Sequence, residues 1–465
     1  MKILTIIFLF IGSIIIQAQS ITGTWQGAIN VQGTSLRIVF HIEEADGKLT
    51  SKMDSPDQGA TGIATSETTF SDDQLMIKAA QLGLTYEGQL ANDTTVVGTF
   101  TQGGMALPLT LKRGGDKKEA VLRPQDPTEF PYQQEVVYFA NAEGHKLAGT
   151  LTIPEANSFE KIVVLISGSG PQDRNEELAP MNHRPFLVLS DYLTRHGIAV
   201  LRYDDRGVAE SEGDFAKATS LDFAQDVQAA VAFLQQHAAT TDKSIGLIGH
   251  SEGGMIAPMV ASESEVVDFL VLLAGPGIPI VELLKLQSEQ ALKATNAAPE
   301  VRKANVKALG AAYEYLAANS TISKDSLHQG LTKVLEEYWE VMPEETKQSI
   351  SDKQVFLNQQ VNTLTADWFL YFLTYQPSEY LKQVRCPTLA INGALDVQVT
   401  ADENLAGIKA ALKAGGNQNF TTKKIENQNH LFQTASTGAV AEYGKIEETF
   451  NENTMRLITD WVLAL

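Results

Sequence analysis

The chain has 465 residues and a formal net charge of −20 at neutral pH. Its length predicts about three domains of ~150 residues each, and its acidity argues against nucleic acid and anionic membrane surfaces as partners. The one cysteine, Cys386, cannot form an internal disulfide, which excludes a small disulfide-stapled scaffold. Cys386 precedes Pro387 at the start of an expected strand, where we expect a small buried apolar group rather than a nucleophile.

Residues 1–19 are expected to form a secretory signal peptide. Met1 and Lys2 precede the apolar stretch Ile3–Ile16, and the small residue Ala18 suits a cleavage site. The stretch is too short for a convincing spanning helix, and no later apolar run approaches the ~18 residues that a membrane span needs. We therefore expect an exported protein, periplasmic or extracellular, with no membrane span after processing.

Residues 20–114 are predicted to form an accessory β domain. Alternating segments such as "SLRIVFHIE" and "TVVGTF" are separated by turn signals such as "DGK" and "NDT". Alternation with period two, interrupted every ~8–12 residues, is typical of an antiparallel meander or barrel. The segment contains one histidine, His41, and no plausible catalytic cluster, so we expect a binding, docking or assembly role. Residues 115–132, rich in charge, Gly and Pro, are expected to form a linker.

From Gln133 the pattern changes to apolar strands that alternate with amphipathic helices. Runs such as "KIVVLIS", "IAVLRY" and "FLVLLAG" predict buried strands, and "LDFAQDVQAAVAFLQQHA" repeats its apolar residues at helical spacing. Apolar strands separated by helices indicate a mostly parallel sheet covered on both faces. We assign residues 133–277 and 384–465 to this α/β domain, and we expect its chemistry at the carboxyl ends of the strands.

One of these strand ends, in "SIGLIGHSEGGMIAPMV", holds a candidate catalytic residue. The string Gly-His-Ser-Glu-Gly directly follows a strand-like run and precedes a helix, which is the setting of a nucleophile elbow. Two other serines in glycine-containing strings, Ser211 in "AESEG" and Ser169 in "SGSGP", lack that setting. We therefore predict that Ser251 is a nucleophile; the alternative is a glycine-rich turn without chemistry.

Residues 278–383, which come next in the chain, are expected to form a helical cap. About 105 residues separate "LVLLAGPG" from "RCPTLA", far more than a strand crossover needs, and helical patterns fill them. Inserted at the active-site edge, these helices would cover it. The most apolar part is "DWFLYFLTY". Its residues Trp368, Phe369 and Phe372 either line an acyl pocket or pack the cap onto the core, and one helix could do both.

A serine nucleophile needs a base, and in this fold an acid and then a histidine follow the serine along the chain. Only His328 and His430 come after Ser251. His430 follows the strand-like "FTTKKIE", whereas His328 lies in a polar helical region, so His430 is the predicted base. Asp396 follows another strand-like run and is the predicted acid, with Asp402 as the alternative.

The oxyanion of the tetrahedral intermediate needs N–H donors aimed at it. One should be the amide of Glu252, the residue after the nucleophile. We assign the second to the Ser169 amide, in the small residues that end "VVLISGSGP", with Gly170 as the alternative. A plain flexible turn is the other interpretation of that loop. The sequence has no H-E-x-x-H, Cys/His cluster or P-loop motif, so neither a metal nor another cofactor is expected.

Five segments together resemble secreted bacterial α/β-hydrolase esterases of the serine-aminopeptidase-like branch: "GSGPQDRN", "RYDDRGVAESEG", "GHSEGG", "CPTLAINGALDVQV" and "NHLFQ". The resemblance covers residues 133–465, and the β module resembles the N-terminal extension of some such proteins. It implies a carboxylesterase of the α/β-hydrolase fold with the predicted serine, aspartate and histidine as its triad. One departure is Ala209, where such proteins usually carry a second glycine. This loop is expected to shape the fold through Asp205 and Arg206, so the change concerns the geometry of the loop, not catalysis.

We therefore expect a serine hydrolase that cleaves short- to medium-chain carboxylic esters through an acyl-enzyme intermediate. A serine exopeptidase of the same fold is one alternative, in which a cap carboxylate such as Glu337, Glu340 or Glu379 would bind the substrate amine. A non-catalytic protein that binds a glycan or a cell-surface partner is another. The expected partner is a small-molecule ester, and association with further copies of the chain stays open.

Overall fold

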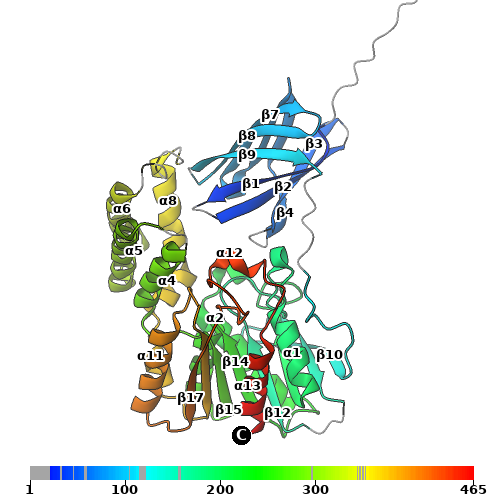
Figure 1. Cartoon of the computed structure of the whole chain (residues 1–465), viewed down its shortest axis with the longest axis vertical. Coiled ribbons are helices and arrows are strands. Elements are labelled where there is room, and N and C mark those ends of the chain that lie inside the picture. The colour runs from blue at the N-terminus through cyan, green and yellow to red at the C-terminus, as the bar shows by residue number, and fades with distance from the viewer. Residues whose placement is uncertain are drawn as a thin grey trace, which may run out of the picture.

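The computed structural model describes residues 21–31, 34–45, 47–56, 60–103, 105–114, 122–155, 159–294, 297–342, 344, 347, 350 and 352–465. The expected signal peptide and residues 115–121 of the expected linker lie outside these residues. Figure 1 shows the antiparallel sheet in blue above an α/β unit, with the green and yellow helices of the cap segment beside them. Among the described residues, no helix combines the length and apolarity that crossing a bilayer would require.

The N-terminal part is a curled antiparallel sheet, as the alternating segments predicted. Its described strands follow the order β4-β3-β2-β1-β9-β8-β7-β6-β5. The sheet curls far enough for the hydroxyl of Ser51 to lie 2.9 Å from that of Thr65 and 2.8 Å from that of Thr68. Large apolar side chains fill its concave interior, with Trp25 and Phe40 fully buried. The elements are β1 (Gly23–Val31), β2 (Thr34–Ala45), β3 (Lys48–Ser55), β4 (Ala60–Ala64), β5 (Glu67–Ser71), β6 (Gln74–Ala79), η2 (Ala80–Leu82), β7 (Leu84–Asn92), β8 (Thr95–Gln102) and β9 (Met105–Arg113).

The second sheet, in the order β10-β11-β13-β12-β14-β15-β16-β17, confirms the predicted α/β architecture. The pairs from β13 to β17 are parallel, whereas β10 and β11 are antiparallel additions at one edge. The chain passes from β12 outward to β13 and then back across β12 to β14, and such a reversal opens a crevice at the carboxyl ends of the strands. The strands are β10 (Gln133–Ala140), β11 (Lys146–Ile153), β12 (Lys161–Ile166), β13 (Ile198–Tyr203), β14 (Ser244–His250), β15 (Val267–Leu273), β16 (Thr388–Gly393) and β17 (Phe420–Ile425).

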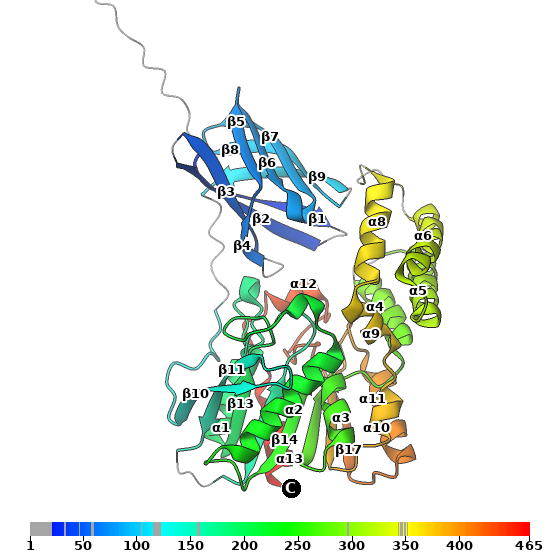
Figure 2. The same ribbon diagram turned by 180° about the vertical axis from the view of Figure 1, so that it is seen from behind.

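Helices cover both faces of this sheet, as continuous apolar strands require. Helices α1 and α13 pack on one face and α2, α3 and α11 on the other, so that the two views in Figures 1 and 2 show different helices in front. Strands β12, β13 and β16 between them are almost wholly buried. The helices are η3 (Ala179–Met181), α1 (Pro185–Arg195), η4 (Phe215–Lys217), α2 (Ser220–Gln236), α3 (Gly253–Glu263), α11 (Ala401–Ala414), α12 (Val440–Tyr443) and α13 (Glu452–Leu463).

The segment between β15 and β16 is helical. Helices α5 and α6 pack against each other, and α9 returns the chain toward the sheet edge (Figure 2). Met105 of β9 forms an isolated antiparallel bridge with Ile350, just before α8, so the N-terminal sheet contacts this helical segment. The described helices are α4 (Ile280–Ala294), α5 (Pro299–Asn319), α6 (Lys324–Val341), α8 (Lys353–Leu364), α9 (Asp367–Thr374) and α10 (Pro377–Leu381).

Local structure explains three details of the sequence, at Ala209, Ser211 and Cys386. Ala209 adopts a left-handed backbone conformation with φ +46°, which costs an L-residue about 1–2 kcal/mol and accounts for the usual glycine at this place. The nearby Ser211 is buried and its hydroxyl bonds both the Ala148 amide and the Asp204 carbonyl, so it is a structural group. Burial raises the pKa of the Cys386 thiol to about 12, so this thiol stays protonated and unreactive at neutral pH.

Candidate active site

Ser251 occupies a sharp turn between β14 and α3. Its φ of +53° is left-handed, a conformation that is strained for a residue with a side chain and that clusters at functional sites. A Cβ at Gly249 would lie 2.0 Å from the Gly253 carbonyl oxygen, and a Cβ at Gly253 would lie 2.1 Å from the Ile166 carbonyl oxygen. Only glycine fits at both positions, so these two residues let the turn pack backbone against backbone.

His430 and Asp396 meet at the ends of β17 and β16. The Nδ1 atom of His430 lies 2.8 Å from Oδ2 of Asp396, and both side chains are buried. The other carboxylate oxygen, Oδ1, accepts hydrogen bonds from the Gln398 amide at 2.8 Å and the Val399 amide at 2.9 Å. The carboxylate is therefore fixed by three donors, and it orients the imidazole with Nε2 left for another partner.

The alternatives for acid and base lie elsewhere. Asp402, in the first turn of α11, pairs with Lys424 at 2.8 Å and its side chain is 77% exposed. His328, on α6, has its Nε2 atom 2.8 Å from the Thr365 hydroxyl, within the helical segment. The structure thus brings Asp396, and not Asp402, to His430.

The predicted oxyanion donors flank Ser251. A Cβ at Gly168 would lie 3.2 Å from the Ser251 Cβ, which shows how closely the loop after β12 approaches the turn. The Gly168 amide is taken, since it donates to Glu176 Oε1 at 2.8 Å. Throughout the part of the chain that the structure describes, no protein acceptor takes a hydrogen bond from the Ser169 or Glu252 amide. The alternative donor, Gly170, follows with φ +103°.

Buried carboxylates hold the loop after β12, residues 167–176. Asp205 accepts from the Gln172 amide at 3.0 Å and from the Ser167 hydroxyl at 2.9 Å. Asp204 accepts from the Arg174 amide at 2.8 Å and pairs with its guanidinium. Asp205 therefore helps to shape the fold through direct contacts to this loop, the oxyanion loop, which carries the predicted oxyanion donors.

Arg206, the other residue expected to shape the fold, contacts helix α2. Its guanidinium binds Asp226 on α2 through two hydrogen bonds, at 2.7 Å and 2.8 Å. Both side chains are almost completely buried, where an ion pair is tolerated only with such bidentate geometry. Arg206 therefore anchors the turn that follows β13 to helix α2.

Glu252 has a role that the sequence analysis did not foresee. Its buried carboxylate accepts hydrogen bonds from the Ser169 hydroxyl at 2.6 Å, the Ser220 hydroxyl at 2.6 Å and the Trp368 indole at 2.9 Å. The side chain therefore joins the oxyanion loop, the start of α2 and helix α9. Only the position of a glutamate after the nucleophile was visible in the sequence, and its partners lie far away along the chain.

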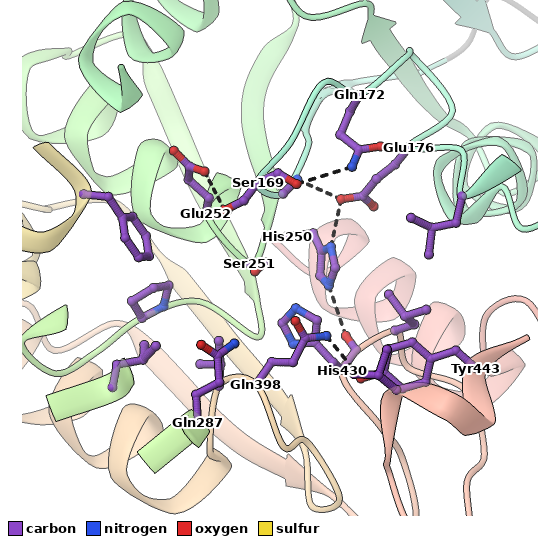
Figure 3. A pocket seen from close by; sticks show the side chains of 18 of the residues that line it. Ser169, Gln172, Glu176, His250, Ser251, Glu252, Gln287, Gln398, His430 and Tyr443 are labelled. Atoms are coloured by element: carbon purple, nitrogen blue, oxygen red, sulfur yellow. Dashed lines mark hydrogen bonds and ion pairs between the residues drawn. The ribbon is translucent and has the colours of Figure 1, made fainter. Parts of the chain in front are cut away.

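A cavity of about 410 Å³ opens over Ser251 and His430. Figure 3 shows Ser251 between the Ser169–Glu252 pair on one side and His430 on the other. The three aromatic residues predicted from α9 line this cavity, and the rings of Trp368 and Phe372 stack with centroids 5.2 Å apart. Glutamine and tyrosine side chains add further polar groups to the wall: Gln172, Gln287, Gln398 and Tyr443.

The acidic residues considered for amine binding do not reach the cavity. Glu337, Glu340 and Glu379 are exposed, and none is among its lining residues. Two carboxylates that do line it, Glu176 and Glu252, already accept hydrogen bonds from protein donors. Within the described residues, no group of three or more His, Cys, Asp or Glu side chains is arranged to hold a metal ion.

The structure also reveals an ion pair between Glu176 and His250, the residue before Ser251. The Nδ1 atom of His250 lies 2.8 Å from Glu176 Oε1, and its Nε2 atom lies 3.0 Å from the His430 carbonyl oxygen (Figure 3). Both side chains are buried. The sequence offered a signal for this pair only in the histidine that precedes the nucleophile.

The chain is similar to a known protein family and to several esterases. The family model described as serine aminopeptidase, S33 (Hydrolase_4) matches residues 184–433, more than half of the chain. Esterase EstD of Thermotoga maritima is 24% identical over 340 residues, which cover 71% of this chain and 70% of that esterase. A solved esterase of Pyrococcus furiosus is 16% identical with a TM-score of 0.43, covering 75% of this chain and 99% of that one. Est1E of Butyrivibrio proteoclasticus is 16% identical with a TM-score of 0.40, covering 71% of this chain and 98% of that one.

The raised pKa of Asp205 leads to a prediction about stability. Burial raises the pKa of this carboxyl well above its usual value, although the bonds from Gln172 and Ser167 act in the opposite direction. A carboxyl with a raised pKa in the folded state binds its proton more tightly there, so its stabilising contribution is full below the unfolded pKa of ~4 and is lost as the pH rises. Asp205→Asn cannot ionise, so it should gain stability relative to wild type between about pH 4.5 and about pH 7, as measured by urea unfolding.

The exposed Asp402 provides the control. Asp402→Asn should show no comparable gain in unfolding free energy over the same pH range, because its side chain is 77% exposed and solvent screens its charge. A stability difference between Asp205→Asn and wild type that stays constant with pH would contradict the prediction.

Proposed function

Because this chain belongs to the serine aminopeptidase S33 family of α/β-hydrolases, we propose that it is a carboxylesterase that cleaves short- to medium-chain esters through a Ser251–His430–Asp396 triad. One observation carries the proposal: His430, held by Asp396 at 2.8 Å, faces the same cavity as the strained Ser251. Three strand ends supply one residue each, in the chain order serine, acid, base. The named esterase among its relatives agrees with this reaction class.

The chemical steps follow from these positions. His430 Nε2 takes the proton of the Ser251 hydroxyl while Oγ attacks the ester carbonyl carbon, and Asp396 stabilises the imidazolium that forms. The Ser169 and Glu252 amides donate hydrogen bonds to the oxyanion of the tetrahedral intermediate. His430 then protonates the departing alkoxide and leaves an acyl-enzyme. Water, deprotonated by His430, then attacks the carbonyl carbon of the acyl-enzyme. The bond to Ser251 Oγ breaks, His430 returns the proton to Ser251, and the carboxylic acid is released.

The cavity supports a division between acyl and alcohol groups. Its apolar wall, formed by Pro276, Leu283, Leu284, Trp368, Phe369 and Phe372, suits an acyl chain. Because the indole of Trp368 is hydrogen-bonded to Glu252, this wall is joined directly to the nucleophile turn. We assign the acyl chain to this wall and the alcohol to the remaining, more polar part of the cavity.

Peptidase activity is less well supported. An aminopeptidase must bind the free amine of its substrate, and a carboxylate with unsatisfied acceptor capacity is the usual partner for an ammonium group. The exposed glutamates of the helical segment lie away from the cavity, and Glu252 already binds three donors. Hydrolysis of amino-acid arylamides at rates comparable to those of esters would reverse this preference.

The nucleophile can be tested directly. Wild type should hydrolyse p-nitrophenyl acetate, butyrate or octanoate, and Ser251→Ala should lose at least ~10³-fold in kcat, since a triad without its nucleophile retains only binding and oxyanion stabilisation. The acyl chain length with the highest activity would then indicate how long a chain the apolar wall accommodates. For comparison, Ser211→Ala removes a buried, hydrogen-bonded hydroxyl and should lower stability before it affects turnover. A Ser251→Ala enzyme with near wild-type turnover would refute the assignment.

The acid is tested by a matched pair of substitutions. Asp396→Asn should reduce kcat by about 10³-fold or more, because the amide no longer fixes the productive tautomer of His430 or stabilises its charge. Asp402→Asn, an identical change six residues further on, should leave kcat within about two-fold, since Asp402 pairs with Lys424 at the surface. Equal losses in the two variants would exclude Asp396 as the specific partner.

We also propose export, which rests on the sequence of residues 1–19 alone. Expressed in a bacterial host, the chain should accumulate in the periplasm or medium, and intact mass measurement should show that about 19 residues have been removed. Phe10→Lys, which interrupts the apolar stretch, should block this processing. Recovery of the full-length wild-type chain from the cytoplasm would contradict the proposal.

A further inference from the structure

His250 connects the parts of the site that must keep their relative positions. It is the last residue of β14 and precedes Ser251 directly. Its two ring nitrogens reach in opposite directions: Nδ1 lies 2.8 Å from Glu176 Oε1, and Nε2 lies 3.0 Å from the carbonyl oxygen of His430 (Figure 3). One buried ring thus contacts the loop after β12 on one side and the backbone of the predicted base on the other.

The carboxylate of Glu176 extends this connection to the oxyanion loop. The oxygen that meets His250 also accepts the Gly168 amide at 2.8 Å, and Gly168 precedes the predicted donor Ser169. Glu176 itself has a left-handed backbone, with φ +52°. Such strain persists where the surroundings over-determine it, and it clusters at functional sites.

The hydrogen bonds define the charge of the pair. A carbonyl oxygen only accepts, so the Nε2 atom of His250 must carry a proton, and Nδ1 then needs a second proton to bind a carboxylate. Burial lowers the pKa of His250, but the charge and hydrogen bond of Glu176 and the bond to the His430 carbonyl raise it overall above 6.5. The other titratable groups around the ring are His430, whose ring centroid is 4.8 Å away, Asp396 and His183. We therefore assign His250 as an imidazolium that donates to the Glu176 carboxylate; removing one partner of such a buried pair is costly.

We propose that Glu176 and His250 are positioning residues that hold the oxyanion loop and the backbone of His430 in register around Ser251. The proposal rests on the proposed function, because it takes Ser251 as the nucleophile and His430 as the base. Neither residue exchanges a proton with substrate. They act by fixing distances, and displacing a catalytic group by about 1 Å can cost ~10²-fold in rate.

The test compares identical substitutions at neighbouring glutamates. Glu176→Gln keeps the shape of the side chain but removes its charge, whereas Glu177→Gln changes a residue that pairs with Arg184 at 2.9 Å. Glu176→Gln should lower kcat for p-nitrophenyl butyrate by about 10- to 100-fold with KM changed by less than about three-fold. It should slow phosphonylation of Ser251 by a fluorophosphonate to a similar extent. Glu177→Gln should match wild type in both assays.

A spectroscopic measurement separates positioning from a loss of folding. In wild type with ¹⁵N-labelled histidine, both ring nitrogens of His250 should have protonated chemical shifts at neutral pH, and Glu176→Gln should convert the ring to a neutral form. Glu176→Asp keeps the charge and should retain the imidazolium and recover part of the lost rate. Circular dichroism melting of each variant reports whether the fold is intact.

The outcomes are distinguishable. Wild-type rates in Glu176→Gln, or a neutral His250 in wild type, would overturn the positioning role while the proposed function stands. If wild type neither hydrolyses esters nor reacts with the fluorophosphonate, the proposed function fails and the positioning role fails with it. A slow, folded Glu176→Gln variant with a neutral His250 supports the proposal.

Discussion

The left-handed turn at Ser251 is the constraint on which the rest of the site depends. It can form only because Gly249 and Gly253 let backbone atoms meet where a Cβ would lie 2.0–2.1 Å from a carbonyl oxygen. The close packing brings the end of β14 against the end of β12, so that the loop after β12 passes directly beside the serine. The predicted oxyanion donors, the cavity and the positioning pair all follow from this approach.

Carboxylates then make that loop rigid. Asp204, Asp205, Glu176 and Glu252 each accept hydrogen bonds from it, and all four are buried. A fully satisfied buried polar network holds one conformation, because leaving any member unpaired is costly. From the sequence, the strongly acidic composition indicated only solubility and the exclusion of anionic partners. In the structure, some of these acidic residues lie inside the protein and hold the candidate active site in its geometry.

The helical segment packs on the α/β core, where α10 contacts α3 and α11 and α9 contacts α2. The Trp368–Glu252 hydrogen bond joins α9 to the turn at Ser251. This one bond therefore connects the apolar wall of the cavity to the predicted nucleophile. The N-terminal sheet contacts the helical segment through Met105 and Ile350. The proposed acyl wall therefore lies largely on the segment inserted between β15 and β16, while Ser251, Asp396 and His430 lie at strand ends.

The sequence by itself determined the two sheets, the helical insertion and the order of Ser251, Asp396 and His430, because each has a local signal: an apolar run followed by a polar residue at a strand end. It favoured Asp396 and left Asp402, which follows the same strand, as the alternative, and only the fold shows that Asp396 is the one turned toward His430. The partners of Glu176, Glu252 and Trp368 lay beyond its reach altogether. Those contacts join residues 74, 83 and 116 positions apart, so no local pattern encodes them and only the packing of β12, β14 and α9 brings them together.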